Sequence, residues 1–196
     1  VWIPLPETAV HVAASREHTC ALLAGGTVFC WGSNEFGQLG DGTTTDRANP
    51  ASVVGLPAVA MVDVSDRHTC AVESGGRAWC WGNNRTGQLG IGDAAGPDLC
   101  SQALPTACAL TPQQITGVSD VVSVGAGGDE ESGHTCVRTD LNRVWCWGAN
   151  DERQLGDGTL IARNSPVEMS ELVGIQAMDT GSAHSCAVLG DGTAYC

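Results

Sequence analysis

The feature that most constrains the fold is a short block of sequence that occurs four times. It begins as His18-Thr19-Cys20, His68-Thr69-Cys70, His134-Thr135-Cys136 and His184-Ser185-Cys186. A second cysteine follows ten residues after each first one, and successive histidines are 50, 66 and 50 residues apart. Self-similarity at such a period is typical of proteins built from one repeated supersecondary unit. The sequence therefore predicts a repeat protein.

Each unit is predicted to consist of short β-strands joined by tight turns. In the first unit, residues 19–24 and 27–31 lie on either side of Gly25-Gly26. Glycine, asparagine and aspartate tolerate the positive φ that tight hairpins require. No stretch shows a sustained helical period, so the fold class is all-β. The matching turns are Gly75-Gly76, Asp140-Leu141-Asn142 and Gly190-Asp191-Gly192, and further strands are expected at 10–14, 51–54, 61–65 and 121–125.

Four short strands in about 50 residues match one blade of a β-propeller. The whole chain, residues 1–196, is predicted to be a single partial propeller of about three and a half repeats. The longer middle interval contains two insertions, at residues 93–112 and 127–133. The repeats are placed at approximately 9–56, 57–117, 118–174 and 175–196, the last of them incomplete.

The first three units continue beyond the second cysteine with a shared pattern, Trp-Gly-x-Asn followed by Gln-Leu-Gly. In the first unit this reads Cys30-Trp31-Gly32 and then Gly37-Gln38-Leu39-Gly40. The pattern resembles the regulator-of-chromosome-condensation repeat family, in a disulfide-containing extracellular form. The resemblance implies a propeller of seven four-stranded blades, which would need about 350 residues. The 196 residues are therefore expected to be part of a longer chain, with self-assembly to complete the ring as the alternative.

The ten cysteines are predicted to form five disulfides. The two cysteines of each repeat are equidistant from the centre of a hairpin turn, which places them opposite one another on antiparallel strands. Reduced, buried thiols are one alternative. Structural zinc is another, although it normally requires closer cysteine spacing or interleaved histidines. The expected pairs are Cys20–Cys30, Cys70–Cys80, Cys136–Cys146 and Cys186–Cys196 in the repeats and Cys100–Cys108 in the first insertion.

Charge and cysteine content restrict the partners and the compartment. Nine basic residues, all of them arginine, stand against 22 acidic ones, which gives a net charge of −13. Phosphate recognition needs clustered positive charge, so nucleic acid is excluded as a partner. No run of apolar residues reaches the roughly 18 that a membrane helix needs. Five disulfides would indicate an extracellular, cell-surface or periplasmic location.

The remaining motifs are predicted to be structural. His18, His68, His134 and His184 recur in phase, whereas catalysis needs a residue once, and His11 is expected to be a strand residue. The imidazoles are expected to bond to backbone within each blade, and the aromatic residues beside the second cysteines to pack between blades. Asp41-Gly42-Thr43 and its counterparts are expected to be Asx-type turns, since calcium needs six to eight oxygen ligands. We predict no catalytic residue, metal or cofactor.

The predicted function is a non-catalytic, secreted or cell-surface scaffold that binds a protein or glycan partner. The insertions at 93–112 and 127–133 are the expected contact surface, because loops that depart from a rigid scaffold often carry function. The alternative is a structural subunit of an extracellular filament, coat or envelope; an enzyme-inhibiting propeller or an enzyme is more remote. Nucleotide exchange, chromatin binding and photoreception, known in the family, are not carried over. Asn84-Arg85-Thr86 is an N-glycosylation sequon.

Overall fold

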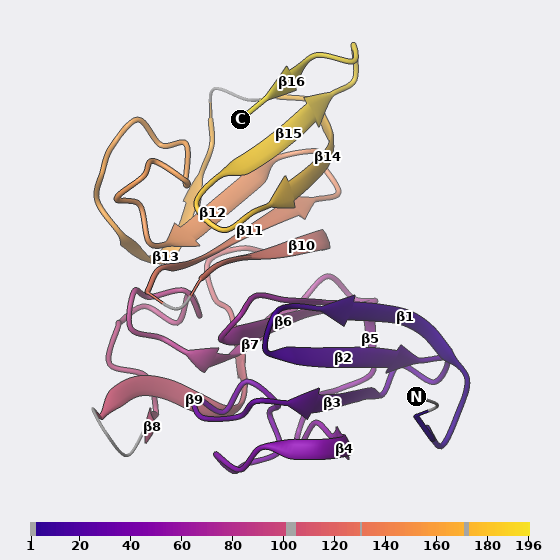
Figure 1. Ribbon diagram of the computed structural model, residues 1–196. Helices are drawn as coiled ribbons and strands as arrows, with labels where there is room; N and C mark the ends of the chain where they lie inside the picture. The colour runs from indigo at the N-terminus through magenta and orange to yellow at the C-terminus, as the bar shows by residue number, and fades with distance from the viewer. Residues whose placement is uncertain (1–2, 101–104, 130, 171–172) are drawn as a thin grey trace.

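The computed structural model describes residues 3–100, 105–129, 131–170 and 173–196, which form four antiparallel β-sheets (Figure 1). The described residues contain 16 strands and no helix, so the all-β prediction is confirmed. The sheets follow one another along the chain, from the indigo strands to the yellow ones. No described segment is a helix long and apolar enough to cross a membrane.

Each sheet is a meander of strands that are neighbours in the sequence, except at one edge of the second sheet. The first sheet contains β1 (Ala9–Ala14), β2 (His18–Leu23), β3 (Val28–Gly32) and β4 (Arg47–Ser52). The second contains β5 (Val59–Val64), β6 (His68–Glu73), β7 (Ala78–Asn83), β9 (Thr106–Gln114) and β8 (Asp98–Cys100), in that spatial order. The third contains β10 (Val121–Gly128), β11 (Gly133–Thr139), β12 (Val144–Gly148) and β13 (Arg163–Glu168), and the fourth β14 (Ile175–Thr180), β15 (Ser185–Leu189) and β16 (Ala194–Tyr195).

The first insertion forms regular structure that its sequence did not suggest. It was expected to be a loop stapled by a disulfide, but β9 pairs with β7 as the fourth strand and β8 pairs with β9 as a fifth. The Cys100–Cys108 disulfide joins these two strands. Its sulfurs pack with Phe36 and Leu110 in a small cluster of their own. The insertion therefore fixes the outer edge of the second sheet against a loop of the first.

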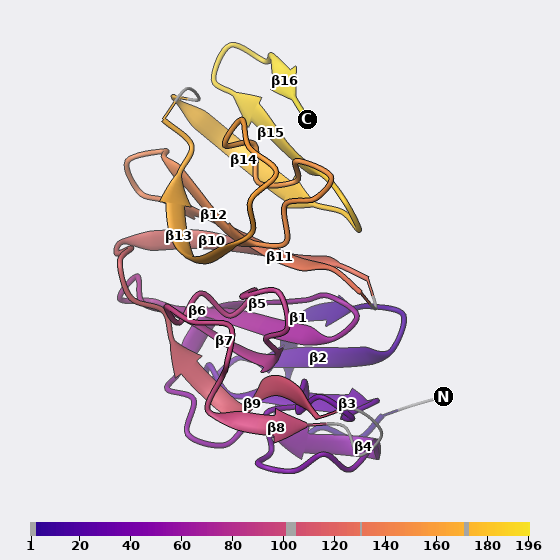
Figure 2. The same ribbon diagram turned by 90° about the vertical axis from the view of Figure 1, so that its left-hand side faces the viewer.

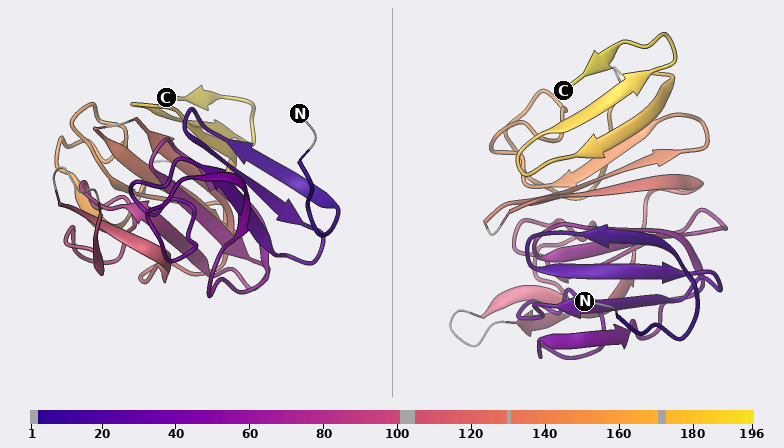
Figure 3. Two further views of the ribbon diagram at one scale, coloured as in Figure 1. Left: turned by 60° about the horizontal axis from the view of Figure 1, so that its bottom comes forward. Right: turned by 45° about the vertical axis from the view of Figure 1, so that its right-hand side comes forward.

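The sheets are arranged as blades around a common edge. The first strand of each sheet contacts the first strand of the next, so that β1, β5, β10 and β14 lie at the inner edge. Figures 2 and 3 show the yellow sheet at one end of the molecule, with β10 to β13 between it and the first two sheets. This is the radial arrangement of propeller blades.

The hydrophobic core lies between adjacent sheets rather than within any one of them. The largest cluster joins residues of the first three sheets and contains Trp81 and Trp147, both 0% exposed. Two equivalent valines show what this packing contributes: Val62 of β5 is 0% exposed, whereas Val12 of β1, with no described sheet before it, is 55% exposed. Burial of each sheet face therefore depends on its neighbour.

Candidate functional sites at the blade contacts and loop ends

The repeated histidines link each sheet to the next one through a hydroxyl group. His18 Nε2 lies 2.8 Å from Thr69 Oγ1, and His68 Nε2 lies 2.9 Å from Thr135 Oγ1. The third link joins His134 Nε2 to Ser185 Oγ at 2.9 Å. The predicted structural role stands, but the predicted partner was wrong, because the imidazoles bind hydroxyls across the blade contacts rather than backbone within a blade.

Each of these hydroxyl groups in turn donates to a backbone carbonyl of the preceding sheet. Thr69 Oγ1 donates to Gln38 O at 2.8 Å, and Thr135 Oγ1 donates to Gln88 O at 2.9 Å. Because a hydroxyl has one proton, it accepts from the imidazole, so Nε2 carries the histidine proton. Nδ1 is then an acceptor, and Ser65 Oγ lies 2.6 Å from Nδ1 of His68.

The buried histidines are held neutral. Burial lowers the pKa of His18 to about 4, and burial together with the neighbouring imidazoles lowers the pKa of His68 to about 3. Burial also lowers the pKa of His134 to about 4. An imidazole whose two nitrogens serve as one donor and one acceptor is committed to the neutral form. These side chains therefore hold the blades together and are poorly suited to proton transfer at neutral pH.

The third histidine lacks one of the contacts that its equivalents make. Gly127, the first residue of the second insertion, pairs with His134 in the sheet and carries no hydroxyl. A Cβ at Gly127 would lie 2.5 Å from Cε1 of His134, so the close approach requires glycine. Nδ1 of His134 consequently has no hydrogen-bond partner among the described residues.

The long loops after the third strand of the first three sheets are organised around a buried asparagine. Asn34 Oδ1 accepts from the Leu39 amide, and its Nδ2 donates to Asp41 Oδ1. Asp41 also accepts from the Thr43 amide at 3.0 Å and pairs with Arg47 at 2.7 Å. The predicted Asx-type turn is therefore present. Asn150, Asp157, Thr159 and Arg163 repeat the arrangement.

Asn84, the sequon asparagine, has the same structural role. It is 0% exposed, its Oδ1 accepts from the Leu89 amide and its Nδ2 donates to Asp93 O at 3.0 Å. Its amide nitrogen, the atom to which a glycan would be attached, is thus inside the folded protein. The asparagine of the sequon is therefore explained by its role in holding the loop in place.

All ten cysteines form disulfides, in the pairs Cys20–Cys30, Cys70–Cys80, Cys100–Cys108, Cys136–Cys146 and Cys186–Cys196. The four repeated disulfides each cross one antiparallel strand pair, with Cα atoms 4.1 or 4.2 Å apart. Within the described part of the chain, no group of three or more His, Cys, Asp or Glu side chains could hold a metal ion.

The second insertion lengthens the β10–β11 hairpin and places its turn beside the loop that leads into the first insertion. Glu131 pairs with Arg85 at 2.9 Å, and Thr86 Oγ1 donates to Gly133 O at 3.0 Å. A shallow groove of about 730 Å³ lies here. Its lining includes the carboxylates of Asp129, Glu131, Asp151 and Glu152.

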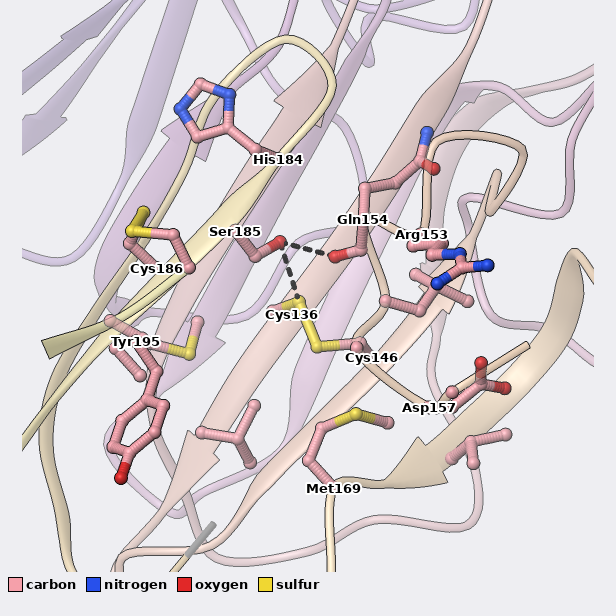
Figure 4. A pocket seen from close by; sticks show the side chains of 18 of the residues that line it. Cys136, Cys146, Arg153, Gln154, Asp157, Met169, His184, Ser185, Cys186 and Tyr195 are labelled. Atoms are coloured by element: carbon pink, nitrogen blue, oxygen red, sulfur yellow. Dashed lines mark hydrogen bonds between the residues drawn. A yellow bond between two sulfur atoms is a disulfide. The ribbon is translucent and has the colours of Figure 1, made fainter. Parts of the chain in front are cut away.

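A second, larger cavity of about 830 Å³ lies between the third and fourth sheets (Figure 4). Cys136 and Cys146 line one side, and Ser185, Cys186 and Tyr195 line the other. Ser185 Oγ donates to Gln154 O at 2.8 Å within it. This cavity could not be predicted from the sequence, because its existence depends on how two sheets meet.

Four radially packed sheets, joined by repeated contacts from His to Thr or Ser, define a β-propeller built from sequence repeats. Two family models, both described as "Regulator of chromosome condensation (RCC1) repeat", match the chain. One matches residues 25–72, 75–136 and 142–188, and the other matches residues 9–38 and 59–88. The chain belongs to this family. The resemblance inferred from the sequence is therefore confirmed.

Curated relatives and solved structures match most of this chain. The human E3 ubiquitin-protein ligase HERC2 is 32% identical over 188 residues, which are 93% of this chain and 4% of that protein. The Arabidopsis thaliana ultraviolet-B receptor UVR8 is 33% identical over 194 residues, which are 97% of this chain and 41% of that protein. A structure of yeast RCC1 (Prp20) bound to Kap60 superposes with a TM-score of 0.81 at 22% identity, covering 98% of this chain and 44% of that one. The chain thus spans less than half of each.

Proposed function

We propose that this chain is a non-catalytic scaffold that binds a protein partner through the loops at one end of its blades, outside the cell or at its surface. The observation that carries the proposal is the position of the two insertions. Both depart from the repeat, and the Arg85–Glu131 ion pair joins the second insertion to the loop that leads into the first.

The functional groups of the repeat support a scaffold rather than an enzyme. The buried histidines contact hydroxyl groups of neighbouring sheets, and the buried asparagines hold loops in place. The two relatives have unrelated activities by name, since one is an E3 ubiquitin-protein ligase and the other an ultraviolet-B receptor. A shared repeat with such different activities supports a general binding scaffold, because function resides in sites placed on a fold rather than in the fold itself.

The groove beside the β10–β11 turn favours a partner with a basic contact segment. Asp129, Glu131, Asp151 and Glu152 contribute carboxylates to one groove, and Arg85 is paired with Glu131 there. The net charge of −13 has the same sign. Electrostatic steering by such a surface would accelerate encounter with a basic partner and weaken with salt.

Capture of partners from extracellular fluid tests this proposal. The wild-type chain is compared with a variant carrying Asp129→Asn, Glu131→Gln and Asp151→Asn, and each retained protein is identified and its affinity remeasured after purification. We expect the variant to lose affinity by tenfold or more. A matched control, Asp140→Asn with Asp191→Asn, removes exposed carboxylates from hairpin turns at the opposite end and should retain binding. Equal affinity for all three proteins would contradict the proposal.

The location outside the cell is supported by the cysteines. Ten paired cysteines are typical of oxidising compartments, since the cytosol keeps thiols reduced. Thiol counting on protein isolated from its natural source tests this part separately. Ten reactive thiols after denaturation would contradict it.

A further inference from the structure

The loop between β12 and β13 carries three consecutive exposed apolar residues (Figure 1). Leu160 is 57% exposed and Ile161 is 61% exposed, and Ala162 is exposed as well. The equivalent positions of the loop between β3 and β4 are residues 44–46, which have the sequence Thr-Thr-Asp. A run of exposed apolar residues is unfavourable in water and is avoided on protein surfaces unless it serves a function. This run therefore points to a contact surface.

The exposure of these positions is a property of the loop itself. In the first sheet the equivalent loop packs against the second sheet, where the Gly42 amide donates to Leu110 O at 3.1 Å. Residues 44–46 are nevertheless exposed. Contact with a neighbouring sheet thus leaves this part of the loop in water.

The loop structure does not require apolar side chains at these positions. In the third sheet, Asn150 Nδ2 donates to the backbone carbonyls of Thr159 and Ile161, at 3.1 and 3.2 Å. Asn34 Nδ2 makes the equivalent two bonds in the first sheet, at 3.0 and 3.2 Å. Both loops therefore adopt one structure, and these bonds hold residues 160–162 in place. A surface that is already ordered loses little conformational entropy when it binds a partner.

The apolar residues border the acidic groove of about 730 Å³ beside the β10–β11 turn. Leu160 and Ala162 line this groove together with its four carboxylates. Arg85 pairs with one of them, Glu131, and both side chains of the pair are more than half exposed. An ion pair so exposed contributes little stability and is readily exchanged for another. The groove therefore combines exposed apolar surface with an excess of negative charge.

We propose that this groove binds a peptide segment of a partner protein in which a large apolar side chain lies within a few residues of two or more arginine or lysine side chains. The apolar side chain packs on Leu160 and Ile161, and the basic side chains pair with the carboxylates. A segment with only one of these features would leave the other surface of the groove unmatched. The inference rests on the proposed function, whose groove it shares, and adds an apolar contact that charge alone does not predict.

Selection from a random peptide library displayed on phage, with the whole chain as the target, tests the chemistry of the occupant. We expect the selected peptides to contain a large apolar residue close to at least two arginine or lysine residues, far more often than the unselected library does. Selection of basic peptides that lack the apolar residue, or of apolar peptides that lack the basic ones, would overturn the proposal. The absence of any selected sequence would overturn it as well.

The double variant Leu160→Thr with Ile161→Thr tests whether the apolar pair makes the contact. It gives the third loop the residues that the first loop already has, so the fold should be retained. The strongest selected peptide, measured by fluorescence anisotropy, should bind the variant at least tenfold more weakly, because apolar area is no longer removed from water. Leu141→Thr is the matched control, because Leu141 is 73% exposed in a hairpin turn at the opposite end, and it should bind as wild type does. Equal affinity for wild type and the double variant, or an equal loss in the control, would refute the contact.

Comparison with the carboxylate variant separates this inference from the proposed function. The double threonine variant retains every charge, so the salt dependence of its peptide affinity should equal that of wild type. The variant with Asp129→Asn, Glu131→Gln and Asp151→Asn should lose both affinity and salt dependence. If only the carboxylate variant lost affinity, the apolar contact would be refuted and the proposed function would stand. If neither variant lost affinity, both would be refuted.

Discussion

Acidification should destabilise this protein well above the pH at which its carboxylates titrate. His18, His68 and His134 are buried and neutral, with pKa values lowered from 6.5 to about 4, 3 and 4. Between pH 6.5 and 4 the unfolded chain takes up protons on these imidazoles and the folded chain does not. Stability is therefore fully present above pH 6.5 and is lost as the pH falls toward the folded-state values.

The size of the loss of stability follows from the difference in histidine protonation between the folded and unfolded chain. At pH 5 an unfolded histidine with a pKa of 6.5 gains about 2 kcal/mol by protonation, at roughly 1.4 kcal/mol for each pH unit. Three such groups amount to about 6 kcal/mol, which is comparable with the whole stability of many domains. The aspartates with lowered pKa values contribute only at lower pH, because they remain ionised at pH 5 in both states.

Urea unfolding at pH 7.5 and pH 5.0, for wild type and His68→Gln, measures the effect. The variant lacks one titrating group, so its free energy of unfolding should fall by about 2 kcal/mol less than that of wild type between pH 7.5 and pH 5.0. His11→Gln is the matched control, because His11 is exposed on β1, and its loss should equal that of wild type. If His68→Gln lost as much stability as wild type, the neutral buried histidines would not be the cause.

Further predictions concern glycine packing, the sequon and the disulfides. Gly90→Ala should lower the free energy of unfolding by about 2–4 kcal/mol, because the added methyl group overlaps Trp147 and the backbone has a positive φ. Gly156→Ala should lower it by about 1 kcal/mol, from the positive-φ strain alone. Denaturant titration of both variants measures the difference. Folded protein secreted from a glycosylating host should carry no glycan on Asn84, as intact mass would show. Reduction should raise the mass by about ten units, and an unchanged mass would disprove the five disulfides.

Much of the fold could be predicted from the sequence because its determinants are local. The turn at Gly25-Gly26 lies midway between Cys20 and Cys30, and the structure pairs these cysteines directly across β2 and β3. Hairpin register depends on turn position and strand length, both of which are visible in one short segment. The same reasoning applies to the Asx turn at Asp41, whose contacts extend only a few residues.

The contacts of the candidate sites could not be predicted because their partners are remote in sequence. His18 meets a hydroxyl 51 residues away, and His68 meets one 67 residues away. A local sequence pattern cannot specify a contact between residues so far apart in the chain. The expectation that the imidazoles bind backbone within a blade was wrong for this reason. The repeat did contain a usable signal. A threonine or serine directly follows each repeated histidine, and its hydroxyl group binds the histidine of the preceding unit.

The sequence by itself determined the repeat, the strands, the turns and which cysteines lie opposite one another, because each depends on neighbours within one unit. Only the tertiary structure decided what lies between units: the neutral histidines, the buried Asn84, the strands made from the first insertion and the cavity beside Gly156. The physical reason is that burial and close packing arise where two sheet faces meet. The residues of one blade do not specify the distance or the angle at which the next blade packs against it.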